Sequence, residues 1–156
     1  MQALAEGRAK KMKVLLRQNK MAKEKIAIVV SKFNEEITMK MKKRAVERAK
    51  ELKVDVVKII EVPGAFEIPL AVKKLLEDEK IQGVVTIGTI IKGSTDHDTV
   101  IAQAIAYELL YLSCEYGKPV SLGISGPNIT WEQSKKRIDE YAIRAVDSVV
   151  KVLKKD

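Results

Sequence analysis

The chain has few of the residues that build metal sites and disulfides, and no segment that resembles a membrane span. Cys114 is its only cysteine and His97 its only histidine, which excludes an internal disulfide and a cysteine–histidine metal site. No apolar run approaches the ~20 residues that a membrane span needs, and no signal-peptide core is visible. Because Cys114 ends an apolar run in a chain without disulfides, we expect a buried structural thiol and a cytoplasmic protein.

Aromatic residues are also scarce, at 4% of the sequence, so an aromatic side chain in a loop is notable. Positive charge, in contrast, is in excess, with a net charge of +8. Residues 1–25 hold eight of the basic residues and only two acids, which leaves a nearly neutral body. Only this segment is typical of polyanion binders, and for the whole protein we expect no nucleic-acid partner.

The basic segment also divides the chain. Residues 1–24 carry a narrow apolar stripe if they are helical (Ala5, Ala9, Met12 and Leu16), while Lys13–Arg17 is equally compatible with a short strand. We therefore expect a basic N-terminal extension over 1–24, mobile or docked at an edge, followed by one domain over 25–156.

Strand and helix patterns alternate along this domain. Apolar, β-branched runs predict strands at 26–30, 54–62, 84–91 and 120–124. Longer periodic patterns predict helices at 35–52, 66–78, 96–116 and 131–154, with Leu70, Val72, Leu75 and Leu76 facing the core of the second. Such βαβ units predict an α/β fold: a three-layer αβα sandwich around a doubly wound, four-stranded parallel sheet.

In sheets of this kind, ligands bind beyond the carboxyl ends of the strands. Four loops are expected there, at 31–34, 62–67, 92–97 and 125–130, and the unusual residue clusters of the chain fall in these loops. The sequence therefore predicts an enzyme or a small-molecule binder. Its glycines form neither a phosphate-binding P-loop nor a dinucleotide-binding fingerprint.

The first two loops offer groups that suit an organic ligand. Phe33 is either a platform for a planar ring or a loop residue folded onto the core. Asn34 is either a helix N-cap or a ligand contact. Glu67 is favoured near the start of a helix, and it could equally accept hydrogen bonds from a polyol.

The third loop, within Gly88–Asp98, has the ingredients of an anion site. Ser94 and Thr95 are either helix caps or phosphate ligands, and the two roles are compatible because free amides point out of a helix start. Thr95 and Asp98 have the spacing of a capping box. Lys92 either supplies a positive charge or is simply solvated. His97 either moves protons beside a bound phosphate or is a structural or exposed histidine.

Together the three loops resemble a known family. Ser-Lys-Phe-Asn (31–34), Val-Pro-Gly-Ala-Phe-Glu-Ile-Pro (62–69) and Gly-Thr-Ile-Ile-Lys-Gly-Ser-Thr-Asp-His (88–97) are similar to the three signatures of 6,7-dimethyl-8-ribityllumazine synthases. The order and spacing agree from about Ile26 to the C-terminus, and Leu-Gly-Ile-Ser-Gly-Pro (122–127) looks most like archaeal members. The resemblance implies a flavodoxin-like arrangement of the sandwich.

The resemblance also implies a reaction. The family condenses 5-amino-6-(D-ribitylamino)pyrimidine-2,4-dione with 3,4-dihydroxy-2-butanone 4-phosphate, without a metal or organic cofactor, in riboflavin biosynthesis. His97 is then implied as the catalytic residue, moving protons during Schiff-base formation, phosphate elimination and ring closure. The implied substrate-binding residues are Phe33 and Asn34, Ala65, Phe66 and Glu67, Thr89 and Ile90, Lys92, Ser94 and Thr95, Leu122, and Arg137.

Within that set, Phe33 stacks on the pyrimidine, residues 65–67 hold the ribityl chain, and Ser94 and Thr95 hold the phosphate. Leu122 and Arg137 reach the site of a neighbouring subunit, because the family works as pentamers that in many members form hollow shells of sixty subunits. The chain departs from the common pattern in several places. Lys92 replaces an arginine, which removes its bidentate fork, and Leu122 replaces a phenylalanine. Tyr141 falls near where a second basic residue is often found, and the common Gly-Asn-Lys-Gly segment is absent.

The partners implied are small-molecule substrates and further copies of the chain, with no membrane. Two alternatives remain at this point. One is the archaeal-type riboflavin synthase, which shares the fold and the Val-Pro-Gly turn. The other is a cage-forming subunit whose role is structural.

Overall fold

A four-stranded parallel sheet is the centre of the structure, a computed structural model that describes residues 1–155 and, at 19–21, the backbone only. The strands lie in the order β2-β1-β3-β4, and each neighbouring pair is parallel. Their bounds are β1 Lys25–Ser31, β2 Asp55–Val62, β3 Gly83–Ile91 and β4 Gly123–Ile129. The strand order reverses between β1 and β3, which is where doubly wound sheets bind ligands.

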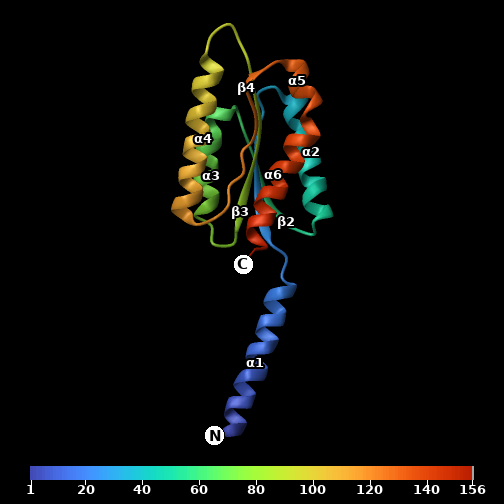
Figure 1. The fold of residues 1–156 in the computed structure, drawn as a ribbon, viewed down its shortest axis with the longest axis vertical. Coiled ribbons are helices and arrows are strands. Elements are labelled where there is room, and N and C mark those ends of the chain that lie inside the picture. The colour runs from blue at the N-terminus through green and yellow to red at the C-terminus, as the bar shows by residue number, and fades with distance from the viewer. Residues whose placement is uncertain (156) are drawn as a thin grey trace.

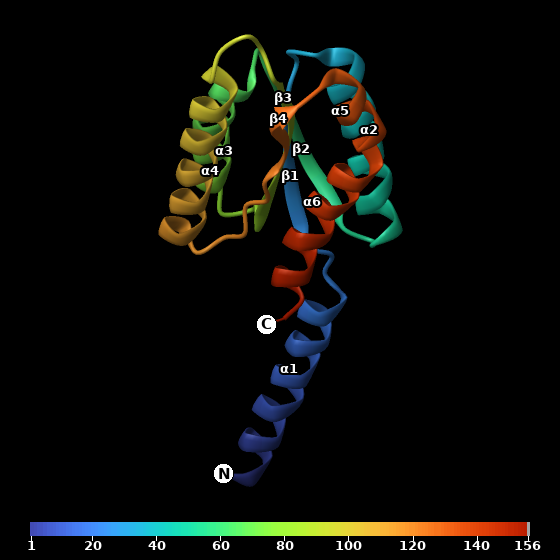
Figure 2. The same ribbon diagram turned by 45° about the horizontal axis from the view of Figure 1, so that its top comes forward.

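Helices cover both faces of the sheet, as Figure 1 and Figure 2 show. One face carries α2, α5 and α6, and the other carries α3 and α4. The bounds are α2 Glu35–Glu51, the 3-10 turn η1 Ala65–Glu67, α3 Ile68–Leu76, α4 His97–Tyr116, α5 Trp131–Lys136 and α6 Ile138–Leu153. The prediction of a three-layer αβα sandwich with a doubly wound parallel sheet is therefore confirmed.

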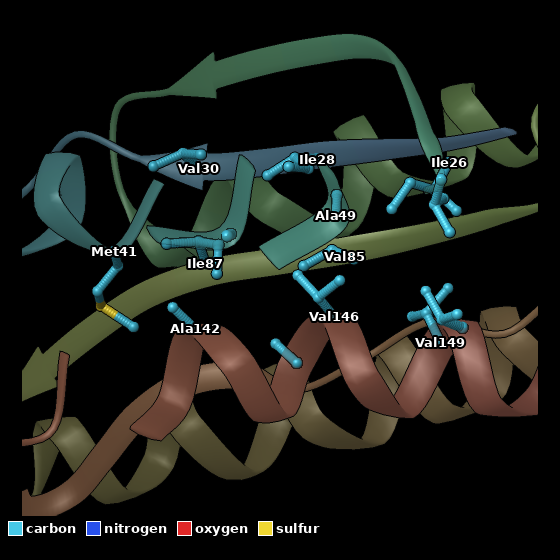
Figure 3. Packing of buried hydrophobic residues seen from close by; sticks show 14 of the residues in the cluster. Ile26, Ile28, Val30, Met41, Ala49, Val85, Ile87, Ala142, Val146 and Val149 are labelled. Carbon is cyan, nitrogen blue, oxygen red and sulfur yellow. The ribbon is translucent and has the colours of Figure 1, made fainter. Parts of the chain in front are cut away.

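The central strands are buried on both faces because their alternate side chains enter two different cores. Ile26, Ile28 and Val30 of β1 pack towards α2 and α6, as Figure 3 shows for the first of these cores. Ala27 and Val29 belong to the second core, on the side of α3 and α4. This alternation with a period of two explains why an unbroken run of β-branched residues forms β1.

The start and end signals of several helices agree with the sequence. Glu35 and Glu36 occupy the first turn of α2, where the helix dipole favours acids. Pro69 lies in the first turn of α3, where its missing N–H costs no hydrogen bond. Gly117 ends α4 in the left-handed conformation (φ 61°), which glycine adopts without a steric cost.

Two elements differ from the prediction. The last strand covers Gly123–Ile129 rather than 120–124, because only an isolated bridge from Val84 pairs Val120 with the sheet. The predicted helix over 131–154 is divided at Arg137 into α5 and α6. The two pieces pack differently: Ser134 of α5 is bonded to the ends of β3 and β4, while α6 lies along the core.

Two side chains were placed wrongly within helices that were otherwise predicted well. Cys114 of α4 is exposed, and Leu70 of α3 is 61% exposed. Both helices carry apolar residues on more than one face, so the hydrophobic pattern alone did not identify the buried face.

The basic segment forms a helix of its own, α1 Gln2–Met21. Its residues up to Gln18 are all exposed. Figures 1 and 2 show α1 extending away from the amino-terminal edge of the sheet. Within residues 1–155, none of the helices is long and apolar enough to cross a membrane.

Candidate functional site

A cleft of about 430 Å³ opens at the carboxyl edge of the sheet, beside the point where the strand order reverses. Its walls come from the ends of β1 and β3, the turn after β2 and the first turns of α4. The lining residues are Phe33, Asn34, Ala65, Thr89, Ile90, Ile91, Gly93, Ser94, Thr95, His97, Asp98 and Ile101. Three predicted loops therefore meet in one cavity, although they are far apart in the sequence.

The loop after β1 is held by the loop after β2. The Lys32 N–H donates to the Val62 carbonyl (2.8 Å) and the Phe33 N–H donates to the Pro63 carbonyl (2.9 Å). These bonds continue the strand pairing beyond the end of β1, and the Phe33 side chain remains 70% exposed at the cleft. Phe33 is thus not folded onto the core, and its ring is free to contact a ligand.

Asn34 precedes α2 in the left-handed conformation (φ 62°). Its side chain makes no capping bond to the helix; instead the amide donates to the Thr89 carbonyl at 3.4 Å. Asn34 is thus the N-cap residue of α2 by position, as predicted, but its side chain links the β1 loop to β3 across the cleft instead of capping the helix.

The turn after β2 places only Ala65 in the cleft wall. The Glu67 carboxylate accepts the Gly64 N–H at 2.9 Å, so it stabilises its own turn. Phe66 is 68% exposed, and neither Phe66 nor Glu67 lines the cavity. Their side chains lie beside the cleft rather than in it.

The loop between β3 and α4 forms the opposite wall. Ser94, Thr95 and His97 are exposed and line the cleft. The N-cap of α4 is Asp96, which makes no side-chain capping bond, so the predicted capping box of Thr95 and Asp98 is absent. The Ser94 and Thr95 hydroxyls therefore lie at a helix start without capping it, an arrangement suited to an anion.

Beneath the cleft floor, three buried hydroxyls form a closed triangle. The Ser125 hydroxyl donates to Thr89 Oγ1 (2.6 Å), Thr89 Oγ1 lies 2.7 Å from Ser134 Oγ, and Ser134 Oγ lies 3.1 Å from Ser125 Oγ. Each side chain is at most 3% exposed. The triangle joins β3, β4 and α5, and it includes the side chain of Thr89, a residue of the cleft lining.

Three further predicted site residues do not line the cleft of their own chain. Lys92 is exposed, and its N–H donates to the Ile129 carbonyl at 2.9 Å. Leu122 is 51% exposed and lines a second, apolar cavity of about 160 Å³ with residues of α4 and β4. Arg137 is exposed at the break between α5 and α6.

Four lining residues were not predicted: Ile91, Gly93, Asp98 and Ile101. Ile91 and Gly93 are neighbours of predicted positions along the chain. Ile101 follows His97 by four residues, so it shares a helix face with it, and this periodicity could have identified it. The sequence suggested Asp98 as a capping residue and as one of the two acids that flank His97, but its burial could not be read from the sequence.

The clearest electrostatic perturbations lie outside the cleft. Hydrogen bonds from Lys42 lower the pKa of Glu61 on β2, with an N–O distance of 2.7 Å. Bonds to Asp147 and Glu51 raise the pKa of Arg48. Within residues 1–155, no group of three or more histidine, cysteine or acidic side chains could hold a metal ion.

Comparison with known proteins agrees with this geometry. The model of the 6,7-dimethyl-8-ribityllumazine synthase family matches residues 23–156. The chain belongs to this family. Its three-layer fold is thus the fold of this family.

Archaeal members are similar over most of this domain. A 6,7-dimethyl-8-ribityllumazine synthase of Metallosphaera sedula is 52% identical over 131 residues, which cover 84% of this chain and 87% of the relative. The corresponding protein of Methanopyrus kandleri is 50% identical over 135 residues, covering 86% and 95%. That of Sulfolobus acidocaldarius is 48% identical over 134 residues, covering 86% and 85%.

Proposed function

We propose that this enzyme condenses 5-amino-6-(D-ribitylamino)pyrimidine-2,4-dione with 3,4-dihydroxy-2-butanone 4-phosphate to form 6,7-dimethyl-8-ribityllumazine and release phosphate. The observation that carries the proposal is the cleft, where the loops after β1, β2 and β3 meet in a chain that belongs to this family. An aromatic ring lies on one wall, and hydroxyls at a helix start lie on the other with a histidine beside them.

The two walls suit the two substrates. Phe33, exposed and fixed by its backbone, stacks on the pyrimidine ring, while the peptide groups of Thr89 and Ile90 border that ring. Ser94 and Thr95 bind the phosphate, where the free amides of α4 add to their hydroxyls. The two substrates are therefore held with the pyrimidine amine close to the ketone carbonyl.

The chemistry then needs orientation and proton transfer. The amine is already a nucleophile, so holding it near the carbonyl supplies much of the acceleration. His97 transfers protons as the Schiff base forms, as phosphate leaves and as the second ring closes. None of these roles requires a metal or organic cofactor.

The ribityl chain extends along the turn after β2. Ala65 lines the cleft there, and the exposed backbone of Phe66 beside it donates or accepts hydrogen bonds. The Glu67 carboxylate bonds to the Gly64 N–H through one oxygen, and its other oxygen can accept from a ribityl hydroxyl.

A neighbouring subunit completes the site. Leu122 and Arg137 are exposed but lie outside the cleft of their own chain. The outer face of α4 is also apolar and exposed, with Val100, Tyr107 and Leu110 each more than 60% accessible. An exposed patch of this kind is typical of a subunit contact. We therefore propose a homo-oligomer, built from pentamers, in which Arg137 binds the phosphate in the next subunit's cleft and Leu122 covers the ring.

The pentamer could remain free or assemble further into a shell of sixty subunits. Its place of action is proposed to be the cytoplasm, where the chain's single thiol stays reduced.

The test is to incubate the purified protein with both substrates and follow the lumazine absorbance and the released phosphate. Both products should appear in equal amounts. Incubation with each substrate alone, and with lumazine alone, provides the controls. Formation of riboflavin from lumazine alone, without the butanone phosphate, would contradict the proposal.

A further inference from the structure

Asp98 differs from the acid on the other side of His97. Asp96 is exposed at the N-cap of α4. Asp98 is only 5% exposed, although residues 92–97 before it are all exposed. A buried carboxylate needs a hydrogen-bond partner. Its partner is a backbone amide of β4: Asp98 Oδ2 accepts the Asn128 N–H at 3.0 Å.

The Asn128 N–H is available for this bond because β4 does not pair with β3 at this residue. Thr89 pairs with Ser125 and Ile91 pairs with Ile129, so residues 126–128 bulge opposite Ile90. Asn128 has a positive φ of 58°, as expected where an extra segment turns out of a strand. The Asn128 N–H therefore finds its partner on α4 instead of on the neighbouring strand.

The bulge itself is pressed against the cleft wall. Gly126 has a φ of 106°, and a Cβ there would overlap the Ile90 carbonyl. Ile90 and Asp98 both line the cleft. The Asp98 bond thus connects the start of α4 to a segment that is fixed on β3. Figure 1 shows the end of β4 and the start of α4 on the same edge of the sheet.

We propose that Asp98 is a positioning residue for the reaction. By accepting the Asn128 N–H, its carboxylate fixes the first turn of α4 and so directs His97 into the cleft. The inference rests on the proton-transfer role proposed for His97. A displacement of a reacting group by about 1 Å can lower the rate of such a reaction by up to about 100-fold. The Asp98–Asn128 hydrogen bond, called the tether below, lies next to His97 in the chain and therefore affects the rate.

Two substitutions separate the tether from the charge. Asp98→Asn removes the charge but keeps an oxygen that can accept the Asn128 N–H. Asp98→Glu keeps the charge but lengthens the side chain by one CH₂, which displaces the turn. The proposal predicts a kcat within about twofold of the parent for Asp98→Asn and a fall of about tenfold or more for Asp98→Glu. The opposite order would overturn it.

The matched control is Asp96→Ala, which removes a carboxylate equally near His97 in sequence but not tethered to β4. Its kcat should stay within about twofold of the parent. A fall as large as that of Asp98→Glu would show that nearby charge, and not the tether, supports the reaction.

A double-mutant cycle tests whether Asp98 acts through His97. His97→Ala should slow the reaction without abolishing it, and adding Asp98→Glu should then cost nothing further. An equal loss in both backgrounds would show a general structural role and overturn the inference alone. If His97→Ala ran at the parental rate, the proton-transfer role would fail, and the Asp98 inference with it. Thermal unfolding of each variant shows that the rates compared are those of folded protein.

Discussion

Phe33 combines an exposed ring with a backbone that is held by the hydrogen bonds of Lys32 and Phe33 to the β2 loop. Truncating such a side chain removes a ligand contact without disturbing a core. We therefore predict that Phe33→Ala raises the KM for the pyrimidine by up to about tenfold, since an aromatic stack contributes about 0.5–1.5 kcal/mol beyond burial. The KM for the butanone phosphate should change little. Steady-state kinetics with each substrate varied in turn measures both.

Phe33→Tyr is the control, because it keeps the ring and should keep the KM close to the parental value. An unfolding temperature that falls with Phe33→Ala would indicate instead that the ring supports the fold. An unchanged pyrimidine KM would remove Phe33 from the site.

At the scale of the elements, the hydroxyl triangle explains why α5 exists as a separate piece. Ser134 is bonded to the ends of β3 and β4, which holds α5 against the cleft floor. Ser134→Ala leaves two buried hydroxyls with one partner fewer. We predict a loss of about 1–3 kcal/mol in the free energy of unfolding, the usual cost of breaking a buried hydrogen bond on one side.

Chemical denaturation measures this loss, and Ser148→Ala provides the comparison. Ser148 is an exposed serine of α6 whose hydroxyl donates to the Ala145 carbonyl at 3.0 Å. Its replacement should cost less than about 0.5 kcal/mol. Equal costs for the two serines would mean that the triangle adds no stability of its own.

A cluster of ion pairs on α2 should respond to pH. Arg48 of α2 binds Asp147 of α6 (2.7 Å) and Glu51 (2.9 Å), and Arg44 also binds Glu51 (3.0 Å). These bonds, first from Arg48 and then from Arg44, lower the pKa of Glu51 in the folded state. The ionised carboxylate is therefore favoured by folding.

A lowered pKa contributes stability above the unfolded value of about 4.3, and that contribution is lost as the pH falls through the folded value. We predict that Glu51→Gln lowers the unfolding temperature at pH 7. The difference from the parent should shrink as the pH falls below the unfolded value of about 4.3 and disappear below the lowered folded pKa of Glu51. Glu115→Gln, at an exposed position on α4, should show a small difference at every pH. A Glu51→Gln difference that persists in acid would contradict the ion-pair explanation.

The sequence predicted elements well where one signal dominated. The β-branched runs identified β1, β2 and β3, and Gly117 marked the end of α4. The sequence-based prediction failed where contacts between elements determine the local structure. No proline or glycine marks the break at Arg137 in the sequence. The helix breaks there because the hydrogen bonds of Ser134 and the core face of α6 impose different directions on α5 and α6. Because β4 continues through its bulge to Ile129, it lies later in the sequence than the apolar run at 120–124 predicted.

The same division holds for the cleft. Motifs in three loops identified Phe33, Ser94 and His97, which the structure brings together. They could not show that the Glu67 carboxylate bonds to Gly64, or that Asp98 is buried against β4. Those facts depend on side-chain directions that a linear pattern does not contain.

For the whole molecule, the proposed sharing of sites between subunits leads to a test by complementation. His97→Ala damages the cleft of its own chain, whereas Arg137→Ala should damage the cleft of the neighbour and raise the KM for the butanone phosphate by about 10-fold or more. In mixed oligomers, some clefts combine an intact His97 from one chain with an intact Arg137 from the next.

Co-refolding or co-expressing the two variants should therefore give more activity than the sum of the two variants alone. Lys136→Ala, which changes the basic residue preceding Arg137, is the control for Arg137→Ala. This variant should retain the parental KM for the butanone phosphate. Activity that never exceeds the sum, in oligomers shown by mass to contain both chains, would place both residues in the same chain's site.

The last prediction concerns α1, which is exposed along the part whose burial is described. It extends from the amino-terminal edge of the sheet (Figure 1), whereas the cleft is lined by loops at the carboxyl edge. The family model begins at residue 23. We propose that residues 1–24 are an extension and that 25–156 form the catalytic domain. Removing residues 1–22 should leave kcat and both KM values within about twofold of the parent, because no cleft residue lies in that segment.

The oligomer mass of the shortened chain, measured by light scattering, is the accompanying readout. If α1 contributes nothing to subunit contacts, the number of subunits stays the same and only the mass per subunit falls. A shortened chain that assembles normally but loses activity would contradict the domain division. One that loses both assembly and activity would show that α1 supports the shared sites through the subunit contacts, since the cleft of a single chain would then lack its neighbour's Arg137.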